Sequence, residues 1–465
     1  MFNFAALPPL ALYIHIPWCV RKCPYCDFNS HEKKTELPER AYVDTLLDDL
    51  EHDLPRVWGR GAKGAERHAM GSSRSDERAA GMSPWTLGAA GTAEPKGVAG
   101  ATSEAGQSSD VAGQISSIFI GGGTPSLFSP ESIDRLLSGL RARLVFNPNI
   151  EITLEANPGA SELQKFHEFR AAGINRLSIG IQSFNDDKLH ALGRIHGRRQ
   201  AFAAAEMAHE AGFDNFNLDL MFALPEQRIE QALADVNTAI ALEPTHISLY
   251  QLTIEPNTLF HSHTPVLPDD DAAWHMQEQC QLRLAEHGFG QYEISAYARA
   301  GRQCRHNLNY WEFGDYLGIG AGAHAKLTAA PQQHITRLWK LKQPRAYMEK
   351  TAAPEGNSER IASEQRSPAS PYIDGENRLT PDDAALEFMM NALRLSNGFA
   401  EQLFSQHAGL PLSHIEGPLH TAQERGWLVW DNHTIRPTAT GSRLLNDLLQ
   451  LFMPDRPSAG RKAKG

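Results

Sequence analysis

The sequence has few cysteines, no long apolar run and no excess of basic residues, and each absence excludes a class of protein. Five cysteines in 465 residues are too few for a disulfide framework, which favours a reducing compartment and predicts a cytoplasmic protein. Lys and Arg total 44 against 55 Asp and Glu, and the net charge of -11 argues against nucleic acid as a partner. Residues 5–18 are apolar but carry prolines and no basic start, so we expect neither a secretory signal nor a membrane-spanning helix.

Composition divides the chain. In residues 57–114, 30 of 58 positions are Gly, Ala or Ser, and no helical or strand period is present. Such a segment cannot offset its ordering entropy by burial, so we interpret it as a disordered surface insertion. Residues 351–379 are polar and predict a linker, and residues 454–465 form a short basic tail.

Over residues 1–56 and 115–350, short β-branched and aromatic runs alternate with helical patterns. The expected strands are Leu12–Ile16, Ile115–Ile120, Ile150–Glu155, Leu177–Ile181, Phe216–Leu220 and His246–Gln251. The clearest helical patterns are Glu39–Leu54, Pro130–Leu144, Glu162–Ala172 and Glu226–Leu242. Six alternations of strand and helix imply parallel strands with right-handed crossovers, whereas a closed barrel requires eight such units. We therefore predict an α/β fold with a partial (β/α)6 barrel as its core.

Residues 380–453 have a different pattern. Amphipathic helices are expected at Asp382–Arg394, Ala400–Gln406 and Ile415–Arg425, followed by a hairpin at Trp427–Arg436 and a last helix at Gly441–Phe452. This order is typical of a small helical, winged-helix-like domain. The segment holds no basic recognition stripe, so the pattern is not evidence for DNA binding.

Three cysteines form a C-x3-C-x2-C cluster directly after the first expected strand. Cys19, Cys23 and Cys26 lie close enough to share a metal centre. Zinc is the alternative, but a structural zinc site requires four ligands, usually in two separated pairs. A disulfide would leave one of the three cysteines unpaired. We favour a [4Fe-4S] cluster, in which three protein ligands leave one iron open to a ligand.

Polar or glycine-rich groups follow the other five expected strands. They are Gly121–Pro125, Glu155, Gln182, Asp219 and the segment Gln251–Thr253. Alone, each has a plainer explanation, since GGG-T-P is as often an ordinary turn and an Asp at a strand end usually caps a helix. Together they predict one functional rim, because the carboxyl ends of parallel barrel strands meet at one face.

The cysteine loop, with Tyr25 before its last cysteine, resembles the signature of the radical S-adenosylmethionine (SAM) superfamily. The resemblance covers nearly the whole chain except 57–114. It implies that the open iron binds the amino and carboxylate groups of SAM, and that an electron from the cluster cleaves the sulfonium to a 5'-deoxyadenosyl radical. It implies that Gly122, Gly123 and Thr124 hold the amino group of SAM. It implies that the ribose, the carboxylate or nearby groups of SAM are contacted by Glu155, Gln182, Arg194 and Asp219. It places Tyr13 and Tyr25 beside the cluster and the adenine. The plainer alternatives are a surface helix charge for Arg194 and a rim carboxylate for Glu155.

Within that superfamily, the chain resembles the coproporphyrinogen III oxidase-like group, which has two branches. The oxygen-independent coproporphyrinogen III dehydrogenases, which act in porphyrin biosynthesis, carry a further cysteine at the position of Phe28. The haem-chaperone branch carries a CPYCDF loop and an H-N-x-x-Y-W motif, and this chain has both. The resemblance therefore implies haem as cargo, haem-accepting respiratory proteins and an electron donor as partners, and membrane association only through such partners. The dehydrogenase remains the alternative.

The second motif supplies the candidate haem residues, His306, Asn307, Tyr310 and Trp311. An imidazole beside flat aromatic rings could ligate and stack a porphyrin. Equally, Asn307, Tyr310 and Trp311 could simply pack a loop against the barrel mouth, with His306 as a hydrogen-bonding partner. We expect Cys280 and Cys304 to be buried thiols and His15 to have a structural role beneath the cluster.

Overall fold

The computed structural model describes residues 1–58, 114–159, 162, 164–350 and 370–454. The predicted insertion at 57–114 and the basic tail at 454–465 therefore lie almost entirely outside the described residues. Residues 351–369 of the predicted linker lie outside them as well.

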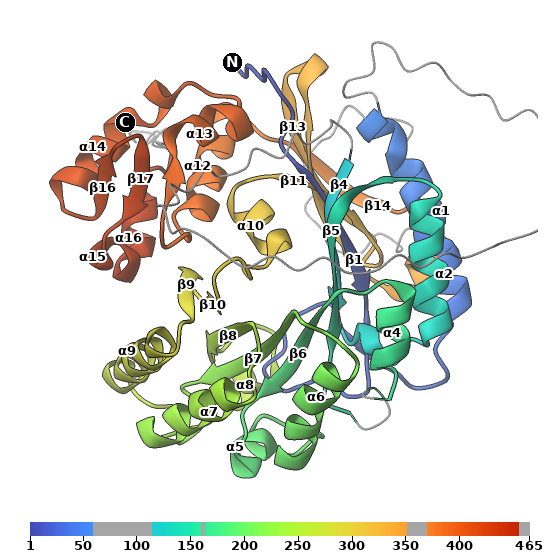
Figure 1. The fold of residues 1–465 in the computed structure, drawn as a ribbon. Helices are drawn as coiled ribbons and strands as arrows, with labels where there is room; N and C mark the ends of the chain where they lie inside the picture. The colour runs from blue at the N-terminus through green and yellow to red at the C-terminus, as the bar shows by residue number, and fades with distance from the viewer. Residues whose placement is uncertain (59–113, 160–161, 163, 351–369, 455–465) are drawn as a thin grey trace, which may run out of the picture.

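A strongly curved sheet organises the molecule (Figure 1). Among the described residues it has 12 strands, in the spatial order β14 (Ile373–Arg378), β13 (His334–Lys340), β12 (His324–Ala329), β11 (Asp315–Ile319), β1 (Leu10–Ile16), β4 (Gln114–Gly122), β5 (Val145–Ala156), β6 (Arg176–Gln182), β7 (Phe216–Phe222), β8 (His246–Gln251), β10 (Ala296–Ala298) and β9 (Gly290–Glu293). Strands β11, β1 and β4 to β8 are parallel neighbours. The six predicted strands are β1 and β4 to β8 in unbroken order, so the predicted partial barrel is confirmed.

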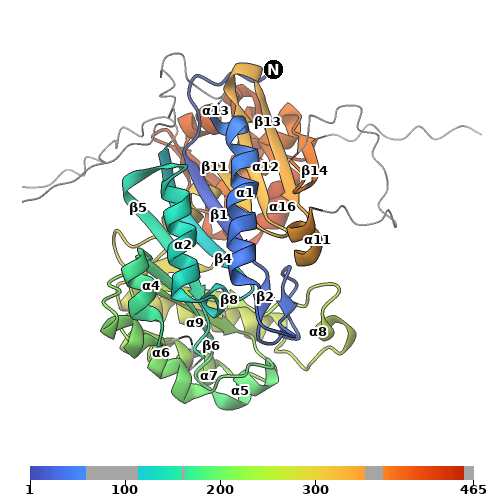
Figure 2. The same cartoon turned by 90° about the vertical axis from the view of Figure 1, so that its right-hand side faces the viewer.

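The helices that connect these strands cover the convex face of the sheet, as α1 and α2 show in Figure 2. They include α1 (Glu39–Trp58), α2 (Pro130–Arg141), α4 (Phe166–Ala172), α5 (Asp186–Ala191), α6 (Arg198–Glu210), α7 (Ile229–Ala241), α8 (Leu259–Ser262) and α9 (Asp270–Glu286). The start of α2 shows how local residues define a helix end. The Ser129 side chain accepts a hydrogen bond from the Ser132 amide, and Pro130 occupies the first helical position. The buried leucines of α2 then face the sheet.

The sheet extends beyond the prediction. Strands β12 to β14 add an antiparallel extension beside β11, and β14 lies within the residues predicted to be a linker. The linker prediction is therefore wrong for 373–378. The sequence I-D-G-E-N-R has the composition of a loop because β14 is an edge strand with mostly exposed side chains, held by its pairing with β13.

The open side of the barrel is covered by a short helix, α10 (Arg305–Trp311), which lies on the concave face of the sheet (Figure 1). It packs against β1, β4 and β11 on one side and against α12 (Pro381–Ala392) on the other. The inward-facing side chains of the parallel strands and of α10 therefore meet in the interior of the barrel, which we call the lumen below.

The C-terminal part forms the predicted small helical domain with a β-wing. Its elements are α12, β15 (Phe399–Ala400), α13 (Glu401–Ala408), α14 (Glu416–Glu424), β16 (Leu428–Asp431), β17 (Thr434–Pro437), α15 (Ala439–Arg443) and α16 (Leu445–Gln450). The last predicted helix is thus two helices that meet at Leu444. The core of this domain also contains Phe4, Phe313 and Ile335, which ties it to the barrel. No helix among the described residues has both the length and the apolar composition that a bilayer crossing requires.

Candidate cluster and cofactor site

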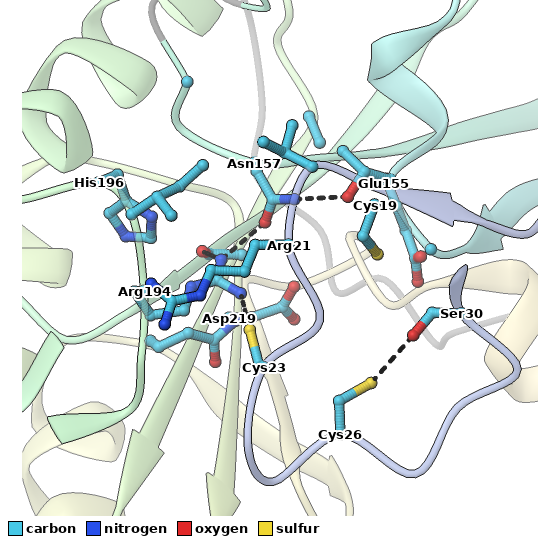
Figure 3. A pocket seen from close by; sticks show the side chains of 18 of the residues that line it. Cys19, Arg21, Cys23, Cys26, Ser30, Glu155, Asn157, Arg194, His196 and Asp219 are labelled. Atoms are coloured by element: carbon cyan, nitrogen blue, oxygen red, sulfur yellow. Dashed lines mark hydrogen bonds between the residues drawn. The ribbon is translucent and has the colours of Figure 1, made fainter. Parts of the chain in front are cut away.

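The cysteine loop follows β1 and is held in place from below and from the side. Nε2 of His15 lies 2.9 Å from the carbonyl oxygen of Asn29, and the Asn29 amide donates to the carbonyl oxygens of Ala321 and Lys342, at 2.9 Å each. The predicted structural role of His15 is therefore confirmed. The three loop cysteines are half-buried, reduced and open to one cavity (Figure 3).

That cavity lies at the carboxyl ends of the strands and is open to solvent; its empty volume, open solvent included, is about 1020 Å³. Its lining contains the three cysteines and most of the residues predicted to contact SAM: Gly122, Gly123, Thr124, Glu155, Gln182, Arg194 and Asp219. Tyr25 and Tyr13 are not part of this lining. The Tyr25 ring packs 6.3 Å from the ring of Phe260, and the Tyr13 hydroxyl lies 2.9 Å from Nδ1 of His15, deeper in the lumen.

Arg194 is the centre of a hydrogen-bond network across the cavity wall (Figure 3). Its guanidinium donates to Oδ1 of Asn157 and to the carbonyl oxygen of Gly180, both at 2.6 Å, and to the sulfur of Cys23 at 3.6 Å. Asn157 in turn donates to the Thr124 hydroxyl at 2.8 Å. The alternative of a surface helix charge for Arg194 is therefore wrong, since its positive charge lies in the cavity.

Asn157 is a site residue that the sequence did not single out by itself. It belongs to the segment that follows Glu155 at the end of β5, and a polar residue at a strand end could have indicated a site residue there. Its partners are 33 and 37 residues away in the chain, so the sequence did not reveal the connection.

The glycine segment after β4 brings backbone to the cavity wall. The Gly122 amide donates to Oε2 of Glu155 at 3.0 Å, with φ at +112°. A Cβ at Gly122 would lie 2.6 Å from the His15 ring, and one at Gly123 would lie 2.5 Å from the Trp18 carbonyl oxygen. Any side chain at either position would therefore displace the cysteine loop or the strand beneath it.

Two carboxyl groups, those of Glu155 and Asp219, also line the cavity. Burial, together with the neighbouring charge of Asp219, raises the pKa of Glu155 to about 8, although the Gly122 amide partly opposes this. Burial also raises the pKa of Asp219, which accepts hydrogen bonds from the Ser178 hydroxyl at 3.2 Å and from the Asn217 amide at 2.8 Å. Paired carboxyl oxygens of this kind suit hydroxyl or ammonium donors on a ligand.

The positions of the three cysteines distinguish the zinc interpretation from the [4Fe-4S] interpretation. Among the residues that the structure describes, no three His, Cys, Asp or Glu side chains converge closely enough to hold one metal ion. A mononuclear zinc site therefore has no support in the geometry. A [4Fe-4S] cluster attaches each cysteine to a different iron, so three thiols that border one cavity fit it.

The candidate haem residues divide between two environments. His306 faces the lumen: its Nδ1 lies 3.2 Å from the Ser117 hydroxyl, and its ring lies 5.2 Å from the Phe119 ring and 6.3 Å from the Tyr13 ring. Its Nε2 has no hydrogen-bond partner among the described residues. We therefore see the hydrogen bond that the packing alternative predicts, and also a ring nitrogen that remains available to a ligand.

Trp311 lies toward the C-terminal domain, whereas Tyr310, four residues after His306, shares the His306 face of α10 and packs its ring 5.5 Å from the Tyr316 ring of β11. The rings of Tyr310 and Trp311 meet edge to face at 5.0 Å, and the Arg394 guanidinium covers Trp311 at 4.6 Å. Asn307 belongs to the same helix turn as His306. His306 and Tyr310 therefore face the barrel, and Trp311 anchors α10 against the C-terminal domain.

A hydrogen-bond chain joins α10 to the cofactor cavity. The Cys304 amide donates to the Tyr292 hydroxyl at 3.3 Å, which lies 2.8 Å from Nε2 of His246. Nδ1 of His246 lies 2.6 Å from Oδ1 of Asn217, whose amide group donates to Asp219. Oδ1 of Asn217 can only accept, so Nδ1 of the neutral His246 ring carries the proton and its Nε2 accepts from the Tyr292 hydroxyl; every donor in the chain therefore points toward Asp219.

The two remaining cysteines are buried thiols, as predicted. Cys280 and Cys304 both have 0% exposure, and burial raises the pKa of each thiol to about 12. Cys304 therefore stays protonated, which makes it a poor ligand for iron beside His306.

Comparison with known proteins agrees with this arrangement. A model of the radical SAM superfamily matches residues 104–239, and a model of the HemN C-terminal domain matches residues 379–444. Two curated relatives are the heme chaperones HemW of Haemophilus influenzae, 43% identical, and of Escherichia coli, 42% identical; each match covers 97% of this chain and 99% of the relative. Among solved structures, the radical SAM enzyme coproporphyrinogen III oxidase (HemN) of E. coli matches with a TM-score of 0.68 and 20% identity, over 96% of this chain and 90% of that one. At this identity, the structural match shows the fold alone.

Proposed function

Because the chain belongs to the HemW heme chaperone family within the radical SAM superfamily, we propose that it binds a [4Fe-4S] cluster, SAM and haem, and delivers haem to respiratory haem proteins. The observation that carries this proposal is the position of His306, which faces the lumen beneath the cavity that the three cysteines border. An electron donor for the cluster is the further partner that this function requires.

The cofactor residues have distinct tasks in this proposal. Cys19, Cys23 and Cys26 would hold the cluster, which supplies one electron and an open iron when bound. Arg194 places a permanent positive charge beside Cys23, where it suits a ligand carboxylate. Glu155 accepts hydrogen bonds from ribose hydroxyls, and its neutral form at neutral pH also allows it to donate one.

His306 has the properties of a haem-iron ligand. Burial, together with the charge of Arg176, lowers the pKa of His306 to about 3, so the imidazole is neutral at physiological pH. Ligating histidines usually donate their second ring N–H to a nearby acceptor, and the Ser117 hydroxyl stands at that place. With Nδ1–H donating to Ser117, Nε2 would be the nitrogen that holds the haem iron.

The second candidate function is an oxygen-independent coproporphyrinogen III dehydrogenase, which the shared fold supports. Phe28 weighs against it. It stands where the resemblance expects a fourth loop cysteine, and it is 66% exposed at the edge of the cofactor cavity.

A haem titration of the full-length protein, reconstituted anaerobically with its cluster, tests the leading proposal. We expect a Soret band that saturates at micromolar haem in the wild type and a weakened, shifted band in His306→Ala. His275→Ala, which removes an exposed histidine from α9, is the matched control and should behave as the wild type. Absence of haem binding by the wild type at micromolar concentration would overturn the proposal.

A further inference from the structure

Arg176 is an unusual group to find at the start of a barrel strand. It is the first residue of β6 and is only 2% exposed. Alternation along the strand places its side chain on the same face as Ser178 and Gly180, and both of those residues line the cofactor cavity. Arg176 therefore lies in the lumen, directly beneath the cavity floor.

Two buried polar atoms at this place lack hydrogen-bond partners. The buried Nε–H of Arg176 donates to no partner among the described residues, and the buried hydroxyl of Thr153 has no partner there either. Thr153 and Arg176 are register partners on β5 and β6, and Thr153 shares its strand face with Glu155. Two unsatisfied hydrogen-bonding groups thus stand side by side and face the same interior space.

The neighbouring carboxylates are occupied by other donors. Oε1 of Glu151 accepts from the Arg305 amide at 2.9 Å and from the Cys304 thiol at 3.6 Å. Both oxygens of Asp219 accept from Ser178 and Asn217. These two acids balance the charge of Arg176 from a distance, but they do not form a hydrogen-bonded ion pair with it. A buried guanidinium left in this state is costly unless a ligand or water completes its hydrogen bonds.

The position of α10 indicates which ligand this is. His306 enters the same lumen from the opposite side, and the charge of Arg176 is close enough to contribute to the low pKa of His306. A porphyrin held by His306 carries two propionates at one edge. A guanidinium is the side chain best suited to a planar carboxylate, which it binds through two parallel hydrogen bonds.

We propose that Arg176 and Thr153 form a subsite for a carboxylate of the cargo, which would be a haem propionate. The proposal rests on the proposed function, since it requires haem to enter the lumen. A carboxylate of the cofactor has the same chemistry, but Arg194 already serves the cavity above, and this leaves Arg176 for the cargo.

Haem and its dimethyl ester separate the propionate contact from every other contact, because the ester keeps the iron and the ring but carries no carboxylate. We would titrate both into the reconstituted wild type, Arg176→Gln and Arg176→Lys, and measure SAM affinity in parallel. We expect Arg176→Gln to weaken haem binding about tenfold or more and to leave the ester and SAM unchanged. Arg176→Lys should restore part of the haem affinity.

The other outcomes overturn the proposal. An equal loss for haem and ester would give Arg176 a purely structural role, and a loss confined to SAM would assign it to the cofactor. If Arg176→Gln does not fold, Thr153→Val removes the neighbouring hydroxyl alone and should still weaken haem relative to the ester; no such difference would refute the subsite. Binding of neither porphyrin by the wild type would instead refute the proposed function, and the subsite with it.

Discussion

Asn157 offers the sharpest test of how the cofactor cavity is built. Its amide group joins Arg194 to Thr124 through two hydrogen bonds, of 2.6 and 2.8 Å. Asn157→Ala removes both while leaving the cysteine loop and the bond from Arg194 to Gly180 in place. The guanidinium then loses one of its three hydrogen bonds and keeps those to Gly180 and Cys23.

The size of the effect follows from the charge on Arg194. A hydrogen bond to a charged group contributes about 1.5–3 kcal/mol, and each 1.4 kcal/mol is a factor of ten in a binding constant. Because Gly180 still holds Arg194, we take the lower end and expect SAM to bind Asn157→Ala about tenfold more weakly than the wild type.

Isothermal titration of SAM into the anaerobically reconstituted protein measures this directly, with iron and sulfide content as the check that the cluster is intact. Asn175→Ala is the matched control, because that side chain also makes two hydrogen bonds, to the backbone of Ile152 and Ile150, but outside the cavity. We expect the control to lose stability and keep its SAM affinity. A change of less than twofold in Asn157→Ala with a full cluster would refute the role given to Arg194.

Three further predictions concern stability. The pKa of Glu155 is about 8 in the folded protein against 4.5 in the unfolded chain, so the folded state binds more protons between these values. The contribution of Glu155 to stability therefore falls as the pH rises from about 5 to about 8. Glu155→Gln should remove this decline when the cofactor-free protein is unfolded with denaturant. Tyr292→Phe leaves buried groups of the hydrogen-bond chain unpartnered and should cost about 1–3 kcal/mol, with faster amide hydrogen exchange in α10. Lys340→Met leaves the fully buried carboxylates of Asp49 and Asp53 without their cation and should cost about 3–5 kcal/mol, part of which a second change, Asp53→Asn, recovers.

Each of these predictions has a result that contradicts it. Parallel pH profiles for wild type and Glu155→Gln would show that Glu155 ionises normally. Unchanged exchange in α10 would show that Tyr292 does not hold that helix. If Asp53→Asn destabilises Lys340→Met further, the buried cluster is not governed by charge balance.

Much of the fold could be predicted because its signals are local. The six parallel strands are short apolar runs with clear helical patterns between them, and the strand-end rule then placed Glu155, Gln182 and Asp219 at one rim. Tyr13 was assigned only by the resemblance, and it belongs to β1, where its hydroxyl lies beside His15 in the lumen and outside the lining of the cavity.

The parts that escaped prediction depend on contacts between distant segments. Strand β14 consists of polar residues and exists because β13 pairs with it. Lys340 pairs with Asp49 and Asp53, which are 291 and 287 residues away in the sequence, so no local pattern in either segment predicts these buried ion pairs. The lumen face of His306 likewise follows from the packing of α10 against β1 and β4, which the motif alone could not show.

The central claim is that this chain carries haem rather than converting coproporphyrinogen. The most direct test gives one anaerobically reconstituted preparation both substrates side by side, haem in one arm and coproporphyrinogen III with SAM and a reductant in the other. The account predicts a saturable Soret band that depends on His306, and no vinyl product in the second arm. Vinyl product at a catalytic rate, without stable haem binding, would contradict it.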